Sequence, residues 1–149
     1  MLMFTSRPTL IISSGGNSGS QATSLIIRAL AVRDVALSDW WRVALRESTS
    51  GIALGLFLGV LGALRIILWP GREALYGPHY VWVGIAVGCS VVGVVMFGTL
   101  CGSMLPFLLR RLGLDPATAS APFVATLVDV TGVIIYFTVA SAILSGRAF

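Results

Sequence analysis

The strongest constraint on this chain is a series of long apolar runs that carry almost no charge. Residues 48–69, 80–109 and 121–145 are each long enough, as helices, to cross a hydrocarbon core of about 30 Å. Only 11% of the residues are charged and 56% are hydrophobic, whereas a soluble domain carries about 25% charged residues. The sequence therefore predicts an all-α membrane protein, folded as a single transmembrane domain over residues 1–149.

A fourth run, residues 1–32, is apolar at both ends and polar at its centre. Residues 13–21 contain three glycines, and each glycine costs a helix about 1 kcal/mol relative to alanine. Non-helical backbone at membrane depth is tolerated where it faces protein or a water-filled cavity. We therefore predict four long helical membrane segments, the first broken by this Gly-rich stretch. The alternative for residues 13–21 is an ordinary surface loop that joins two short helices.

Two polar links separate the predicted segments and set their orientation. Residues 33–47 form an interfacial link with two tryptophans, and residues 110–120 form a link on the same side of the membrane, two crossings later. Together they hold five of the ten arginines, so the positive-inside rule places both links in the cytoplasm. The predicted location is the cell (inner) membrane, with the C-terminus outside. No basic patch is interleaved with aromatic residues, so no nucleic-acid partner is predicted.

Local signals mark the packing faces and the ends of helices. Gly51, Gly55 and Gly59 are spaced four residues apart and predict a smooth helix face that another helix can approach closely. Asp115, directly before Pro116, is typical of an N-cap, and Ser120 precedes the start of the last segment.

Asp129 is the one ionisable residue in the last apolar run. A carboxylate at bilayer depth costs about 2.5–3.5 kcal/mol on insertion scales, so such a residue marks an ion or proton pathway. On a helix it shares a face with Ala125, Thr126, Gly132 and Val133. Oxygen donors without Cys or His suit a hard cation such as Mg²⁺ or Ca²⁺. In a symmetric dimer, two copies of the aspartate could share one divalent cation. Composition alone allows a proton relay equally well.

The Gly-rich stretch offers neutral oxygens that could complement the aspartate. Gly16 and Gly19 would expose backbone carbonyls, while Asn17 and Gln21 add side-chain oxygens. A phosphate-binding loop is a weak interpretation because the stretch lacks the lysine of a P-loop. No Ser–His, Cys–His or paired-aspartate arrangement is present, so we predict neither an enzyme nor a cofactor beyond a transported ion.

Two longer motifs resemble a known family. Residues 15–21 (GGNSGSQ) resemble the GGNxGSQ signature of the MgtE family of Mg²⁺ transporters and channels. Residues 122–132 (PFVATLVDVTG) resemble that family's P-F-x-x-T-x-x-D-x-x-G signature. The resemblance covers nearly the whole chain. It implies Mg²⁺ transport by a homodimer in the lipid bilayer, with the ion path at the dimer interface between the segments 1–32 and 121–145.

The resemblance also implies site residues. It assigns the metal site to four residues, namely Asp129, Ala125, Gly16 and Gly19. Weaker positions along the ion pathway are Asn17, Gln21, Thr126 and Glu47, and for Glu47 a salt bridge with Arg46 or Arg42 is the alternative.

The chain also departs from the family pattern. Family members carry cytoplasmic Mg²⁺-sensing domains and a first transmembrane helix, and neither has a counterpart in these 149 residues. Closure of a channel by a cytoplasmic sensor is therefore not expected of this sequence. The alternative function is a non-transporting membrane scaffold, or an inactive remnant of such a transporter.

Overall fold

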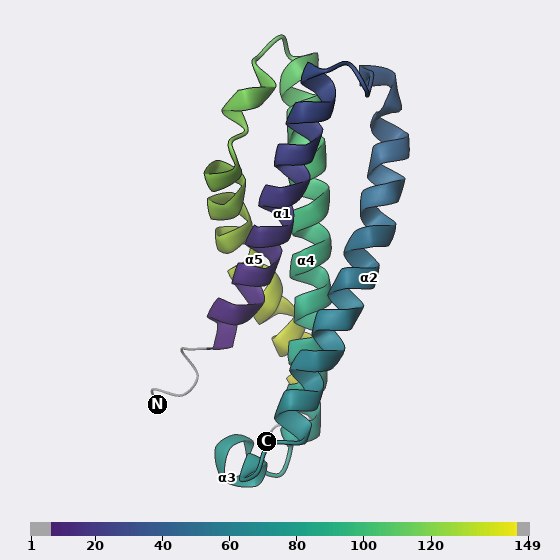
Figure 1. The fold of residues 1–149 in the computed structure, drawn as a ribbon. Coiled ribbons are helices and arrows are strands. Elements are labelled where there is room, and N and C mark those ends of the chain that lie inside the picture. Colours follow the sequence, from purple (N-terminus) through teal and green to yellow (C-terminus); the bar gives the residue numbers. More distant parts are fainter. Residues whose placement is uncertain (1–6, 146–149) are drawn as a thin grey trace.

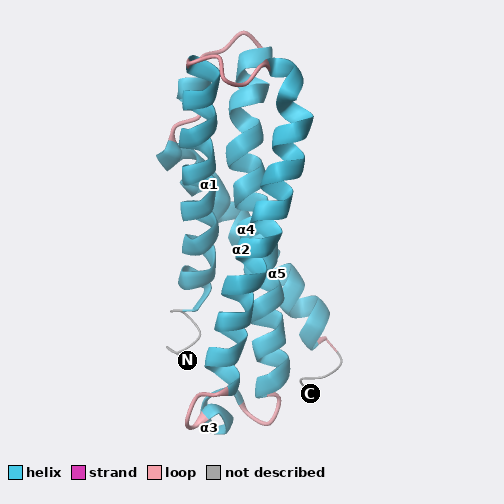
Figure 2. Ribbon diagram, turned by 45° about the vertical axis from the view of Figure 1, so that its right-hand side comes forward, coloured by secondary structure: helices cyan, strands magenta, loops and turns pink. Residues whose placement is uncertain are grey.

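The computed structural model describes residues 7–145, which form four long helices and three short ones. In chain order these are α1 (Arg7–Ala31), η1 (Leu37–Asp39), α2 (Trp40–Ile67), α3 (Arg72–Tyr76), α4 (Tyr80–Arg111), η2 (Pro116–Thr118) and α5 (Ala121–Leu144). This part of the chain contains no strand, as Figure 2 shows. Residues 1–6 of the predicted first segment, and the C-terminus predicted to lie outside, fall beyond the described residues.

Helix α4 is the centre of an elongated bundle. The helices α1, α2 and α5 all pack against α4, and α1 also packs against α5 (Figure 1). The pair α1 and α5 lies on one side of α4, while α2 lies on the other. Helix α3 closes one end of the bundle, and the links with η1 and η2 close the opposite end. This arrangement leaves an outward face on α1 and α5 that no other described helix covers.

Three of the long helices are long and apolar enough to cross a membrane. These are Leu37–Ile67, Tyr80–Arg111 and Ala121–Leu144, with 31, 32 and 24 residues. Helix α1, with 25 residues, would span about 37 Å, but its centre is rich in glycine and serine. The prediction of four long helical segments is therefore confirmed for helix formation, and three of the four have the expected apolar composition.

The predicted break in the first segment is wrong, because α1 is continuous through residues 13–21. The structure also rules out the alternative surface loop. The reason is the packing of two glycine pairs: Gly15 lies against Gly98 of α4, and Gly19 lies against Gly102. A Cβ atom on Gly98 or Gly102 would overlap the carbonyl oxygen of its partner in α1. Close contact between the helices offsets the low helix propensity of glycine.

A buried hydroxyl group reinforces this crossing of α1 and α4. Thr23 Oγ1 lies 2.8 Å from Gly19 O in its own helix and 2.9 Å from Gly102 O in α4, within hydrogen-bonding distance of both. The predicted close-packing face of α2 is confirmed as well, since Gly51, Gly55 and Gly59 are buried against α4. Close approach of helix backbones at glycines thus recurs on two sides of α4.

Two predicted boundaries also need correction. Residues 40–47 of the predicted interfacial link 33–47 belong to α2, which begins at Trp40. Five of these eight residues are Ala, Leu, Arg or Glu, which favour helix, so the helix extends beyond the apolar run. Helix α4 likewise continues to Arg111. The predicted cap at Asp115 is confirmed, because its carboxylate accepts from Ala117 N at 2.9 Å. Ser120, which directly precedes α5, also caps its helix, since its Oγ accepts from Phe123 N at 3.4 Å.

Candidate functional site

Two neighbouring stripes of α5 have different surroundings. One stripe repeats every four residues and is buried against the bundle: Val124, Val128 and Gly132. The second stripe lies one residue further round the helix and is half-buried or exposed: Ala125, Asp129 and Val133. The first stripe therefore anchors α5 against α1 and α4, and this anchoring fixes the direction in which the second stripe points.

The second stripe of α5 forms one wall of a hollow of about 380 Å³, and α1 forms the other wall. The hollow is lined by Ile12, Ser13, Gly16, Asn17, Ala125, Asp129 and Val133. All of these residues come from the two helices that lie together on one side of α4 (Figure 1). We call this space the Asp129 hollow. It gathers one carboxylate, one amide and one hydroxyl group in an otherwise apolar segment.

Gly16 is the position at which the α1 backbone approaches the carboxylate. A Cβ atom at Gly16 would lie 3.1 Å from Asp129 Oδ1 and 3.8 Å from the Cα and Cβ atoms of Ala125. Any larger residue at position 16 would therefore project its side chain into the hollow. Gly16 leaves room beside the carboxylate, whereas Gly15 and Gly19 serve helix packing.

An exposed polar stripe runs along α1 beside the hollow. Ser13, Asn17 and Gln21 follow one another at intervals of four residues, so they share one helix face, and all three are exposed. Gln21 lies one turn beyond the hollow. At hydrocarbon depth, exposed polar and ionised groups have to meet water, an ion or another protein surface. Within a bilayer, the polar stripe of α1 is therefore unsuited to direct contact with lipid tails.

Four of the predicted site residues lie together in the Asp129 hollow: Gly16, Asn17, Ala125 and Asp129. Ser13, which also lines it, was missed by sequence reasoning. Ser13 precedes Asn17 by four residues, so the spacing points to it once the stretch is treated as a helix. Because a break was predicted in this stretch, the four-residue spacing was not applied to it.

The other predicted residues lie outside the hollow. Gly19 faces α4, where a Cβ atom would lie 2.8 Å from Gly98 O. Thr126 is exposed, and its hydroxyl donates to Pro122 O at 3.0 Å. Glu47 is half-buried on α2, a helix that contributes no residue to the hollow.

A single copy of the chain offers an incomplete metal site. Within residues 7–145, no three His, Cys, Asp or Glu side chains come close enough together to hold a metal ion. The hollow instead combines one carboxylate with neutral oxygens, a donor set that suits a hard cation keeping part of its water shell. One carboxylate balances half of the charge of a divalent ion.

The sequence is similar to a known family over most of its length. The family model MgtE, described as a divalent cation transporter, matches residues 9–139. The magnesium transporter MgtE of Thermus thermophilus is 49% identical over 135 residues, which cover 91% of this chain and 28% of that protein. The magnesium transporters MgtE of Enterococcus faecalis and Bacillus subtilis are 34% and 33% identical, over 89% and 85% of this chain.

The chain spans 28% of the length of the first two of these relatives and 26% of the third. The resemblance predicted from the two signatures is confirmed. The matched family consists of transporters rather than enzymes, and its match accords with the three apolar helices of a multi-pass membrane protein. A family model covering residues 9–139, together with three relatives of the same name, shows that this chain belongs to the MgtE family.

Proposed function

We propose that the chain conducts Mg²⁺ across the membrane through a pathway between two copies, with Asp129 as its acidic selectivity site. The observation that carries this proposal is the Asp129 hollow, an open space of about 380 Å³ that holds the only carboxylate of the last apolar helix. The names of the three relatives support Mg²⁺ as the ion. A second copy facing the hollow would bring a second carboxylate to the ion.

The rest of the architecture follows from this proposal. Helix α1 crosses the membrane beside α4, with its exposed polar stripe turned toward the pathway and its glycines toward α4. The exposed apolar side chains of α2, including Leu56, Phe57 and Val60, face lipid. The arginine-rich end of the bundle, which includes Arg33, Arg110 and Arg111, faces the cytoplasm.

The experiment that tests this function is Mg²⁺ uptake into sealed liposomes that contain the 149-residue chain and a trapped Mg²⁺ indicator. We expect uptake above that of protein-free liposomes, and a much smaller uptake for Gly16→Val. The valine side chain would enter the hollow, because a Cβ atom added at position 16 would lie 3.1 Å from Asp129 Oδ1. Competition by Ca²⁺, Mn²⁺ and Co²⁺ in the same assay measures the selectivity.

Gly62→Ala is the matched control, because a Cβ atom at Gly62 meets only Val87 Cγ1, at 3.7 Å. Its uptake should equal that of the wild-type chain. Full uptake by Gly16→Val would contradict the assignment of the pathway to the hollow. An absence of uptake by the wild-type chain would instead favour the alternative, a non-transporting scaffold or inactive remnant.

A separate prediction follows if two copies of the chain pack with the hollow at their interface. In a Cys89→Ser, Cys101→Ser background, Asn17→Cys should form a disulfide between two copies under mild oxidation in membranes. The thiols of the two copies would lie across one pathway, so they would meet repeatedly. The measurement is the fraction of covalent dimer on a non-reducing gel.

Phe57→Cys in the same background is the control, because Phe57 is 64% exposed on α2, on the other side of α4. It should remain monomeric on the gel. A dimer formed through Phe57→Cys and not through Asn17→Cys would place the interface on the wrong face for the proposed pathway.

A further inference from the structure

A second open space lies between different helices from those of the Asp129 hollow. A groove of about 760 Å³ separates the start of α2 from the last third of α4. One wall comes from η1 and the first turn of α2, including Leu37, Ser38 and Trp40. The other wall comes from α4, including Cys101, Met104 and Arg111. Pockets that hold small molecules usually measure about 300–1,000 Å³. We call this space the α2–α4 groove.

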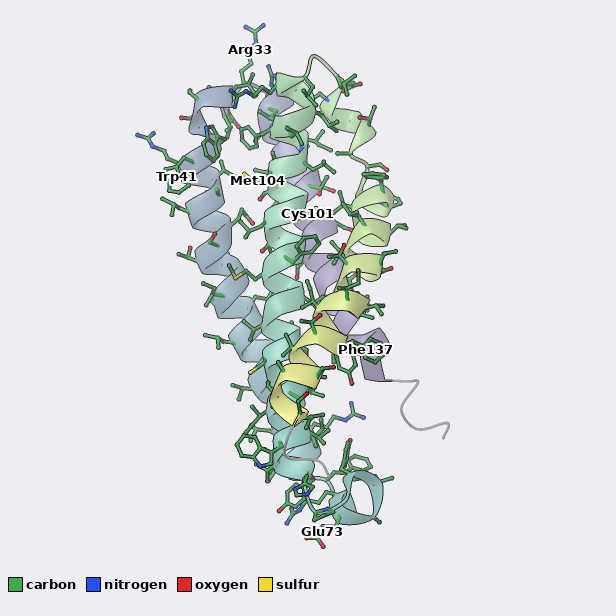
Figure 3. The ribbon with its side chains drawn as sticks, turned by 180° about the vertical axis from the view of Figure 1, so that it is seen from behind. Arg33, Trp41, Glu73, Cys101, Met104 and Phe137 are labelled. Atoms are coloured by element: carbon green, nitrogen blue, oxygen red, sulfur yellow. The ribbon has the colours of Figure 1, made fainter. Side chains whose placement is uncertain are left out.

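The groove is mostly apolar and has a charged residue at one end. Its α4 wall is apolar at Met104, one turn after Cys101, and ends at Arg111, the last residue of the helix. Figure 3 labels Cys101 and Met104 on α4, with α2 beside it. Ser38 lies on the facing wall. A ligand that fits must therefore have an apolar body and an anionic or hydrogen-bonding head at one end.

The two arginines at the end of α4 have different surroundings. Arg110 Nη1 donates to Leu30 O at 2.8 Å, so this side chain ties the end of α4 to the end of α1. Arg111 is exposed and lines the groove instead. Asp39, on the short helix η1 of the opposite wall, accepts from Ala36 N at 2.9 Å through its carboxylate. Arg111 is thus the charged residue among those that line the groove.

We propose that the α2–α4 groove binds an anionic phospholipid, with an acyl chain along Met104 and the phosphate against Arg111 and Ser38. Both walls belong to helices of membrane-spanning length, so lipid can enter from the side. The exposed Trp40 stands beside the charged end, as tryptophans do at headgroup level. Basic pockets between transmembrane helices are known to select anionic headgroups. This inference concerns a separate surface and does not depend on ion transport.

The test is native mass spectrometry of the purified chain in a neutral detergent, with phosphatidylglycerol or phosphatidylcholine of equal chain length added. We expect the wild-type chain to retain phosphatidylglycerol in preference, and Arg111→Gln to reduce that preference about fivefold, the effect of one arginine near an anionic lipid. Arg33→Gln is the matched control. It removes the same charge from the same end of the bundle, and Figure 3 shows Arg33 projecting away from the helices.

Cys101 reports whether the lipid occupies the groove itself. Phosphatidylglycerol should slow the alkylation of Cys101 by N-ethylmaleimide, and phosphatidylcholine should slow it less. Cys89, exposed on the same helix and outside the groove, should react at an unchanged rate. Inorganic phosphate alone should not displace the lipid, because it has no apolar body to fill the groove.

Several results would overturn the proposal. These are equal retention of the two lipids, an undiminished preference in Arg111→Gln, an equal loss in Arg33→Gln, and Cys101 alkylation that lipid does not slow. Protection of Cys101 that depends on protein concentration, in the absence of lipid, would identify a second copy of the chain as the occupant and would also overturn it.

Discussion

Asp129→Asn is expected to reduce Mg²⁺ uptake to the background leak of protein-free liposomes while leaving the helical bundle intact. Asparagine has nearly the same shape as aspartate, so the packing of α5 through Val124 and Val128 should not change. The substitution removes the only negative charge that lines the hollow. Amide and hydroxyl oxygens carry no net charge, so they offset less of the cost of bringing a divalent cation into a low-dielectric region than a carboxylate does. Initial uptake rates at equal protein content provide the measurement.

Glu73→Gln is the matched control for this substitution, because Glu73 is exposed on α3 at the end of the bundle (Figure 3). It should leave uptake close to the wild-type rate. Asp129→Glu keeps the charge but moves it by one methylene group, so we expect partial activity and altered selectivity. If Asp129→Asn carries Mg²⁺ as fast as the wild-type chain does, the acidic site is elsewhere.

The parts of the fold that sequence alone predicts are those governed by local chemistry. Asp115 caps its helix as expected, because capping depends on neighbouring residues. The position of Asp129 on one face with Ala125 and Val133 follows from the periodicity of a helix. These features require no knowledge of the partner helix.

The prediction that failed depended on a distant partner. Gly15 and Gly19 weaken an isolated helix, and sequence reasoning therefore placed a break there. Their effect reverses when Gly98 and Gly102 of α4 lie opposite them, because four missing side chains let two backbones meet. Both pairs are spaced four residues apart, so matching them was the available signal. In the hydrocarbon core, backbone N–H and C=O groups find no water to bond with. A continuous helix is favoured there because it pairs these groups internally.

The same expectation of a break underlies the assignment of individual glycines to the site. Treated as unwound chain, Gly16 and Gly19 both appeared able to offer carbonyl oxygens to an ion. In the continuous helix the two glycines meet different neighbours. Gly16 faces the Asp129 carboxylate, whereas Gly19 faces Gly98 of α4. The GGNSGSQ motif therefore combines a packing surface for α4 with one position that keeps the hollow open.

The importance of this packing surface leads to the second large prediction, that Gly102→Ala destabilises the bundle. The new Cβ atom would overlap Gly19 O and would lie 2.8 Å from both Gly19 C and Thr23 Oγ1. Two of these three atoms are backbone, so α1 would have to move away from α4. Overpacking of this kind costs about 1–3 kcal/mol. The measurement is the change in the free energy of unfolding, obtained by titrating the chain in mild detergent with SDS and following helicity.

Gly62→Ala is the control that separates overpacking from helix propensity. Both substitutions place alanine in a helix, where it is favoured over glycine by about 0.5–1 kcal/mol. At Gly62 the nearest atom to the new Cβ is Val87 Cγ1 at 3.7 Å, an ordinary contact, so this variant should be as stable as the wild-type chain or slightly more stable. Equal stability of the two variants would mean that α1 and α4 do not meet backbone to backbone. A loss in Gly102→Ala alone would instead establish that α1 and α4 meet backbone to backbone at Gly19 and Gly102.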